Sequence, residues 1–198
     1  MKDNILGRFN IDENKIKLIA QSVPKLIIEK YDFCNINLSI LNYKKKFIMV
    51  GNLREVKEPS FLFNYFEKSS NYCLILIGKM LDVKYTLPKN VYHINGLYKD
   101  KIYSIMGKVD GLINTSKSEG QAITILEALK LKCPVYVRNN EGNRAIIKHG
   151  YNGYIFNNEE DFSNIVDLSI NNIIKNGYDY VNKYHNIDIE IEMFNKML

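Results

Sequence analysis

Short apolar runs that alternate with helical patterns constrain the fold of this 198-residue chain more than any other feature of its sequence. The runs predict buried strands at 47–50, 72–77, 91–94, 109–114, 135–137 and 154–156. Helical patterns lie between or after them at 59–68, 99–106, 121–131, 144–149 and 159–175, and a last one follows Gly177. Strands that alternate with helices in this way predict a Rossmann-like parallel sheet with helices on both faces.

The first part of the chain has a weaker pattern. Residues 15–23 predict one strand, Pro24 ends it, and a helical stretch is expected to follow as far as Tyr31. We therefore expect three parts, which are an N-terminal extension over residues 1–41, the Rossmann-like domain over 42–176, and a C-terminal helix over 177–198.

Composition excludes several classes of function. The net charge of +5 suits a phosphate-bearing ligand or an anionic membrane surface, but its dispersion along the chain argues against a nucleic-acid partner. Cys73 and Cys133 lie among apolar residues and are expected in the core, which suits a reducing compartment. The histidines and cysteines lack metal-site spacing, so no metal is expected. The sequence has no signal-peptide pattern and no long apolar stretch, which predicts a cytoplasmic protein.

The strongest candidate site contains Glu119 and Glu127, with seven residues between them, within the segment TSKSEGQAITILEAL. The first amides of the helix expected there lack intrahelical acceptors and form an anion site, and a carboxylate in the second turn can accept hydrogen bonds from two sugar hydroxyls. An ordinary explanation also exists. Ser118 and Gln121 fit a capping box, and Glu127 suits a half-exposed helix position.

A second candidate site follows the strand at 47–50. The strand ends at Gly51, and Arg54 and Lys57 follow in the loop, where two cations can neutralise a diphosphate. An ordinary surface loop explains the same residues. The segment reads G-N-L-R, so the glycine pattern of dinucleotide-binding dehydrogenases is absent.

Five blocks of sequence, in order, resemble one known family. They are VGNLREVK, LILIGK, NVYHING, INTSKSEGQAITILEALKLKCPV and EGNRAIIKHGYNGYIF. Over residues 46–158 the chain is similar to the C-terminal domain of the group 1 (family 4) retaining glycosyltransferases, whose two-domain architecture is called GT-B. Its L-R-x-V-K-[DE]-P and G-N-x-x-x-x-K-H patterns also resemble the glycosyltransferase 1 domain-containing proteins.

The resemblance implies a role for each matching residue. Lys57 is expected to bind the diphosphate of a nucleotide-sugar donor, and Arg54 to replace the family arginine that is Asn52 here. Glu119 is expected to be the catalytic residue beside the donor sugar, and Glu127 to hold the ribose. The remaining donor-binding residues implied by the family are Gly51, Gly120, Gln121, Ala122, Ile123, Leu97 and Tyr98, the last two near the nucleobase.

The chain also departs from the family pattern. Ala122, Cys133 and Ala145 stand where a glycine, a glycine and a glutamate are usual. Residues 15–23 resemble the segment between the two GT-B domains, and this resemblance implies that most of an acceptor-binding N-terminal domain is not included in this sequence. The resemblance implies a nucleotide sugar as substrate, no other cofactor, an unknown acceptor, and either a separate acceptor domain or self-association. Two alternatives to a chain that supplies the donor site of a glycosyltransferase remain: a fragment that needs a separate acceptor domain, and a non-catalytic nucleotide-sugar-binding module.

Overall fold

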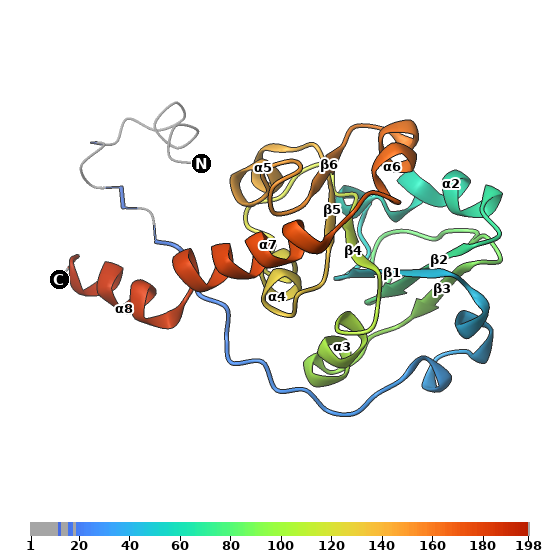
Figure 1. Cartoon of the computed structure of the whole chain (residues 1–198), viewed down its shortest axis with the longest axis horizontal. Helices are drawn as coiled ribbons and strands as arrows, with labels where there is room; N and C mark the ends of the chain where they lie inside the picture. The colour runs from blue at the N-terminus through green and yellow to red at the C-terminus, as the bar shows by residue number, and fades with distance from the viewer. Residues whose placement is uncertain (1–11, 13–15, 18, 198) are drawn as a thin grey trace.

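A computed structural model describes residues 12, 16–17 and 19–197. Its centre is a six-stranded sheet in the order β3-β2-β1-β4-β5-β6, and every neighbouring pair is parallel (Figure 1). The strands are β1 (Lys45–Val50), β2 (Tyr72–Ile77), β3 (Val91–Ile94), β4 (Gly111–Asn114), β5 (Val135–Arg138) and β6 (Tyr154–Phe156). The predicted Rossmann-like α/β class is confirmed, and the strand order reverses direction between β1 and β4.

The strands bury both of their faces because their apolar residues point alternately to the two sides. In β1, Phe47 and Met49 join one core cluster and Ile48 joins the other. The first cluster is covered by α2 (Phe63–Lys68) and α6 (Glu159–Ile165), and the second by α3 (Lys99–Met106) and α4 (Ile123–Lys130), as Figure 1 shows. The helices therefore cover both faces, as predicted.

Helix α7 (Asn171–Tyr184) corrects two expectations about the C-terminal part. The helix predicted over 159–175 is two helices, and α7 runs through Gly177, where a break was expected. Gly177 is buried, and a Cβ there would lie 2.6 Å from Cδ2 of Leu129 on α4. The glycine therefore allows two helices to approach closely, and it does not interrupt one.

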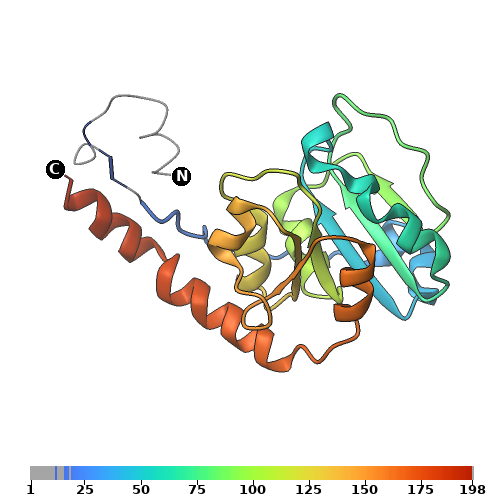
Figure 2. The ribbon, with the colours of Figure 1, turned by 90° about the horizontal axis from the view of Figure 1, so that it is seen from above.

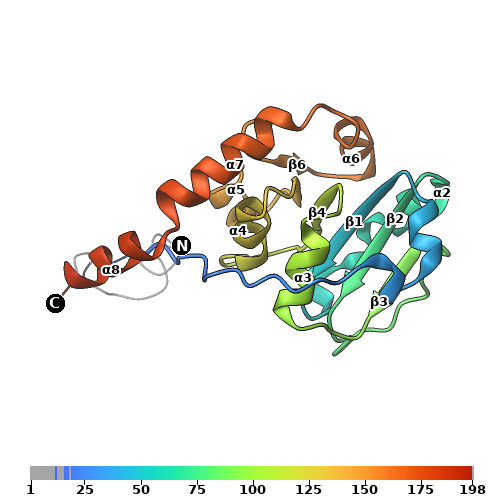
Figure 3. The same ribbon diagram turned by 60° about the horizontal axis from the view of Figure 1, so that its bottom comes forward.

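The N-terminal part also differs from the prediction. Residues 15 and 18 of the predicted strand lie outside the described residues, and the described part of 15–31 contains neither the strand nor the helix. Residues 19–32, which we call the N-terminal strap, pass along α3 in extended form (Figure 3). Two 3-10 helices follow, η2 (Phe33–Asn35) and η3 (Leu38–Asn42), before β1 begins.

The N-terminal strap is attached to the junction between α7 and α8 (Ile187–Asn195), and the two segments lie side by side in Figure 2. The amide of Val23 donates to the carbonyl of His185 at 2.9 Å, and the His185 ring contacts the carbonyl of Gln21 at 2.9 Å. Ser22 hydrogen-bonds the carboxylate of Glu190 through both its amide and its hydroxyl. These long-range contacts fix a segment whose own residues specify no regular structure.

Other element boundaries move by a few residues. The predicted helix 144–149 is α5 (Glu141–Ile146), because the Asn140 side chain caps the amide of Asn143 and starts the helix earlier. The predicted helix 59–68 is η5 (Pro59–Leu62) followed by α2. The usual family glycine before Pro134 corresponds to Cys133. The left-handed backbone lies one residue earlier, at Lys132, which has a φ of 58°.

The strands at 72–77, 91–94 and 154–156 and the helix at 99–106 have the predicted bounds. Cys73 and Cys133 are buried, as predicted. Among the residues that the structure describes, no helix is both long enough and apolar enough to cross a membrane.

Candidate functional site

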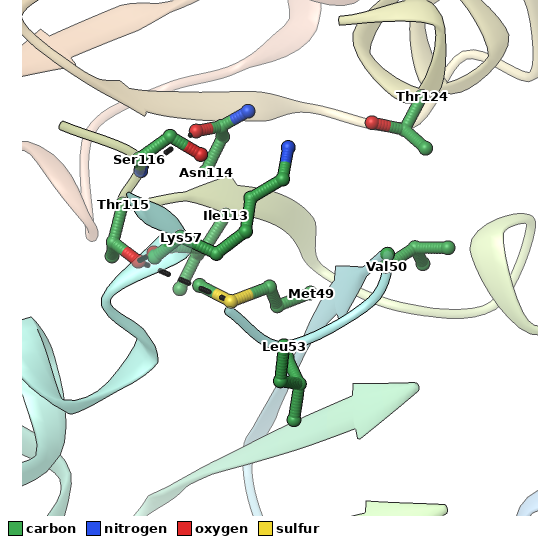
Figure 4. Close-up of a pocket in the computed structure, with 10 residues that line it drawn as sticks. Met49, Val50, Leu53, Lys57, Ile113, Asn114, Thr115, Ser116 and Thr124 are labelled. Atoms are coloured by element: carbon green, nitrogen blue, oxygen red, sulfur yellow. Dashed lines mark hydrogen bonds between the residues drawn. The ribbon is translucent and has the colours of Figure 1, made fainter. Parts of the chain in front are cut away.

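A crevice opens where β1 and β4 end side by side, at the point where the strand order reverses. Open parallel sheets bind their ligands at this position. A small cavity there is lined by ten residues, which are Met49, Val50, Gly51, Leu53, Lys57, Ile113, Asn114, Thr115, Ser116 and Thr124. All of them except Gly51 are labelled in Figure 4. Its volume of about 10 Å³ is that of roughly one water molecule. A larger ligand therefore requires the side chains over the cavity to move.

Gly51 forms the floor of this cavity at the end of β1. Its φ of 137° is reached readily only by glycine, and a Cβ would lie 4.0 Å from Cε of Lys57. Gly78 at the end of β2 packs against it so closely that a Cβ on Gly78 would lie 2.0 Å from the Gly51 carbonyl oxygen. Gly51 therefore leaves room for the Lys57 side chain, and Gly78 allows the ends of β1 and β2 to approach closely.

The Glu119 carboxylate gathers three donors on one oxygen. Oε1 accepts from Nζ of Lys57 at 2.5 Å, Oγ of Ser116 at 2.6 Å and Nδ2 of Asn114 at 3.0 Å. The sequence predicted Lys57 and Glu119 as separate site residues, and the structure pairs them. It also adds Asn114 and Ser116, which follow from the strand-end position but were not singled out.

The Glu119 carboxyl group is held in its ionised form. Burial would raise the pKa of Glu119, but the hydrogen bonds from Lys57, Ser116 and Asn114 outweigh burial and lower that pKa below its ordinary value of 4.5. The side chain is only 11% exposed, so its charge is balanced locally by the ammonium of Lys57. An incoming anion must therefore compete with Glu119 for Lys57.

A pH-dependent stability difference follows from this lowered pKa. A group whose pKa is lower in the folded state stabilises the fold at pH values above its unfolded pKa, and that stabilisation is lost as the pH falls through the folded-state pKa. We expect Glu119→Gln to lower the free energy of unfolding by about 1 kcal/mol at pH 7. Urea unfolding at several pH values should show this deficit shrinking below pH 4.5; a deficit that is constant down to pH 3 would contradict the assignment.

Arg54 lies apart from the cavity. It precedes the short 3-10 helix η4 (Glu55–Lys57), its side chain is exposed, and it makes no ion pair with any described residue. Of the two predicted diphosphate-binding cations, only Lys57 lines the crevice. The role of Arg54 stays a prediction.

Glu127 belongs to a second group of residues, between α3 and α4. Its carboxylate accepts from Nζ of Lys99 at 2.9 Å and from the hydroxyl of Tyr103 at 2.7 Å. The Glu127 side chain is 3% exposed, so a half-exposed helix position is ruled out, whereas that of Lys99 is 64% exposed. Lys99 therefore reaches the carboxylate from the solvent side. Sequence reasoning found neither of these two partners.

The predicted nucleobase-contacting residues lie next to this second group. Tyr98 precedes the first residue of α3 and is 79% exposed, and Leu97 is half-buried. Gly96 before them has a φ of 139° and open space around it. The structure thus places Leu97 and Tyr98 beside Lys99, which contacts Glu127.

The start of α4 presents uncapped amides at the cavity. The helix begins at Ile123 and not at Gln121, and Ala122 before it makes no side-chain cap, so the capping box expected from Ser118 is absent. Gly120 and Gln121 are exposed, and Thr124 lines the cavity. The first amides of an α-helix lack intrahelical partners, and together with the helix dipole they favour an anion.

Helix α5 supports Glu119 from behind. A Cβ on Gly142 would lie 2.1 Å from the Glu119 carbonyl oxygen, so the helix packs directly on that backbone. The side chain of Asn140 donates to the carbonyl of Ser116 at 2.8 Å. Ala145, in place of the expected glutamate, is exposed. Among the described residues, no group of three or more His, Cys, Asp and Glu side chains is arranged to hold a metal ion.

These features define a Rossmann-like α/β domain with a cation, a carboxylate and a helix N-terminus at the carboxyl ends of its central strands. The sequence profile of the family described as "Glycosyl transferases group 1" matches residues 37–188. The chain belongs to this family.

Two curated relatives and one solved structure illustrate the similarity. The "Glycosyltransferase 1 domain-containing protein 1" of Xenopus tropicalis is 30% identical over 170 residues, which are 77% of this chain and 49% of the relative. An Escherichia coli "UDP-Gal:alpha-D-GlcNAc-diphosphoundecaprenol alpha-1,3-galactosyltransferase" is 24% identical over 97% of this chain and 58% of its own length. Anabaena HepE in complex with UDP-glucose superimposes with a TM-score of 0.68 at 19% identity, over 81% of this chain and 50% of HepE.

The chain spans about half the length of the curated relatives that it matches. The resemblance to the glycosyltransferase 1 domain-containing proteins is confirmed, and the fold is that of one domain of a GT-B glycosyltransferase.

Proposed function

We propose that this chain supplies the donor-binding half of a glycosyltransferase and binds a nucleoside diphosphate sugar in the crevice between β1 and β4. The observation that carries the proposal is the Lys57–Glu119 pair, because it puts a cation for a diphosphate beside a carboxylate for sugar hydroxyls. The names of two similar proteins support the substrate class, since one uses UDP-galactose and the other was solved with UDP-glucose.

In the proposed reaction, Lys57 and the first amides of α4 hold the diphosphate. The bond between the sugar carbon and the diphosphate oxygen breaks, and the diphosphate leaves with the electron pair. An acceptor hydroxyl forms the new bond on the same face of the sugar, and its proton passes to the oxygen of the departing diphosphate. Preorganised cations and amides stabilise the charge that develops on the leaving group. Glu119 accepts hydrogen bonds from donor-sugar hydroxyls, and Glu127 accepts from the ribose.

Transfer also needs an acceptor site, which we propose is supplied by a second domain or a partner chain. This chain matches only 49% and 58% of the lengths of the two curated relatives, which supports a two-domain arrangement. The acceptor would then enter the gap between that domain and the crevice.

Thermal unfolding with nucleotides tests the donor site directly. We expect one of UDP, GDP and ADP to raise the Tm, with UDP the first candidate. A ligand that binds only the folded state adds about 2.7 kcal/mol of stability at 100 times its Kd. The nucleoside monophosphates UMP, GMP and AMP serve as controls. Each is expected to raise the Tm less than its diphosphate does. If a well-folded chain shows no shift with any diphosphate, this chain alone does not form a donor site.

A further inference from the structure

The residue directly after Lys57 has an unusual backbone conformation. Glu58 has φ 39° and ψ 59°, in the left-handed region where a Cβ crowds the backbone. It ends η4 and precedes η5, so the loop changes direction at this residue. The position of the Lys57 side chain over Gly51 therefore depends on Glu58 keeping a conformation that is unfavourable for glutamate.

Arg138 at the end of β5 holds the Glu58 side chain. Its guanidinium forms an ion pair with the Glu58 carboxylate and donates to the carbonyl of Thr115 at 3.3 Å. The same group lies over the ring of Phe61, with Cζ 3.9 Å from the ring centroid. The Arg138 and Glu58 side chains are only 23% and 28% exposed. These combined contacts distinguish the pair from an isolated surface ion pair, which contributes little.

The loop backbone is held from the other side by the residues that follow β4. The Thr115 hydroxyl hydrogen-bonds the carbonyls of Lys57 at 2.7 Å and Glu58 at 2.9 Å. The amide of Lys117 donates to the carbonyl of Val56 at 2.8 Å, and its ammonium lies 3.4 Å from the Glu58 carboxylate. Loops from β1, β4 and β5 therefore meet at Glu58.

We propose that Glu58 and Arg138 are positioning residues, which hold Lys57 in place for the donor diphosphate by stabilising the left-handed turn after it. This inference rests on the proposed function of Lys57. Neither side chain touches the ligand in this scheme. The ion pair compensates for the strain of a non-glycine residue, so a glycine at position 58 would need no such pair.

Two substitutions of Glu58 separate strain from charge. Glu58→Ala and Glu58→Gly both remove the carboxylate, but only alanine keeps a Cβ at this φ. Calorimetric titration with the diphosphate that stabilises the wild type should show binding about tenfold weaker for Glu58→Ala and within about threefold of the wild type for Glu58→Gly. Equal affinities for the two variants would overturn the proposal.

Arg138→Met provides the second test, because methionine keeps an apolar stem beside Phe61 and removes the charge. We expect about tenfold weaker binding in the wild-type background. The same change should cause no further loss of affinity in the Glu58→Gly background, because the backbone strain is absent there. It should also cause none in the Lys57→Met background, because the ammonium that Arg138 helps to position is absent. A loss of the same size in all three backgrounds would overturn the proposal, because Arg138 would then act independently of the turn.

Hydrogen exchange without ligand distinguishes a failure of this proposal from a failure of the proposed function. The amides of Lys57 and Lys117 bond to Arg54 and Val56 within the held loop. We expect them to exchange faster in Glu58→Ala and Arg138→Met than in Glu58→Gly. This ranking, in a protein that binds no diphosphate, would refute only the donor site. Exchange that is the same in all variants of a protein that does bind a diphosphate would refute the positioning role.

Discussion

Replacing Lys57 with alanine is expected to weaken the binding of the nucleoside diphosphate about 100-fold, which corresponds to about 2.8 kcal/mol. Two effects combine. The diphosphate loses a charge-assisted hydrogen bond, which contributes about 1.5–3 kcal/mol. The Glu119 carboxylate also loses its cationic partner and then repels the anion. Calorimetric titration of the purified variant measures the loss.

The repulsion makes a double variant informative. Lys57→Ala combined with Glu119→Gln should bind the diphosphate more tightly than Lys57→Ala alone, because the unpaired negative charge is gone. Lys68→Ala is a matched control, since Lys68 is an exposed lysine on α2 with no ion pair to any described residue. An affinity of Lys57→Ala within twofold of the wild type would refute the assignment of Lys57.

Glu127→Gln is expected to weaken diphosphate binding about 30-fold. The carboxylate can accept hydrogen bonds from two ribose hydroxyls, whereas the amide offers one acceptor oxygen and an NH2 group in place of the other. A hydrogen bond to a charged group contributes about 1.5–3 kcal/mol. The buried Tyr103 hydroxyl should continue to orient the side chain, while the exposed Lys99 swings away to admit the ribose.

Deoxyribose nucleotides show whether the contact that Glu127→Gln removes is the one with the ribose. The wild type should prefer UDP to the 2′-deoxy or the 3′-deoxy nucleotide, and Glu127→Gln should bind UDP and that deoxynucleotide almost equally. Glu67→Gln is the control, because Glu67 is an exposed glutamate on α2. If Glu127→Gln keeps the wild-type preference for ribose, Glu127 does not contact it, and any loss of affinity reflects its packing between α3 and α4.

Much of the fold could be predicted because its information is local. The bounds of β2, β3 and β6 follow from apolar runs that end at turn residues. The N-terminal strap could not be predicted, because Ser22 and Val23 are fixed by His185 and Glu190, more than 160 residues away in sequence. A local sequence pattern does not predict such distant partners.

The candidate site also combines residues that a local pattern predicts with contacts between distant residues that it does not. Lys57 and Glu119 could each be singled out from the sequence, but their pairing could not, because they are 62 residues apart. Asn114 and Ser116 were within reach of the same strand-end argument. Glu58 could not be singled out, because a left-handed φ of 39° is unusual for a residue other than glycine. Arg138 could not be singled out either, because its partner Glu58 is 80 residues away in sequence.

In the proposed reaction, the Lys57–Glu119 pair would also allow the crevice to discriminate between a sugar nucleotide and other anions. A free phosphate can bind the Lys57 ammonium, but it supplies no hydrogen-bond donor to replace that ammonium at the buried Glu119 carboxylate. A sugar nucleotide would provide its diphosphate to Lys57 and its sugar hydroxyls to Glu119, so both side chains would have a partner. After transfer, the spent nucleotide has lost the hydroxyls, and the carboxylate again competes for the lysine. In the proposed reaction, the same contact that screens entering anions would therefore hasten the departure of the product.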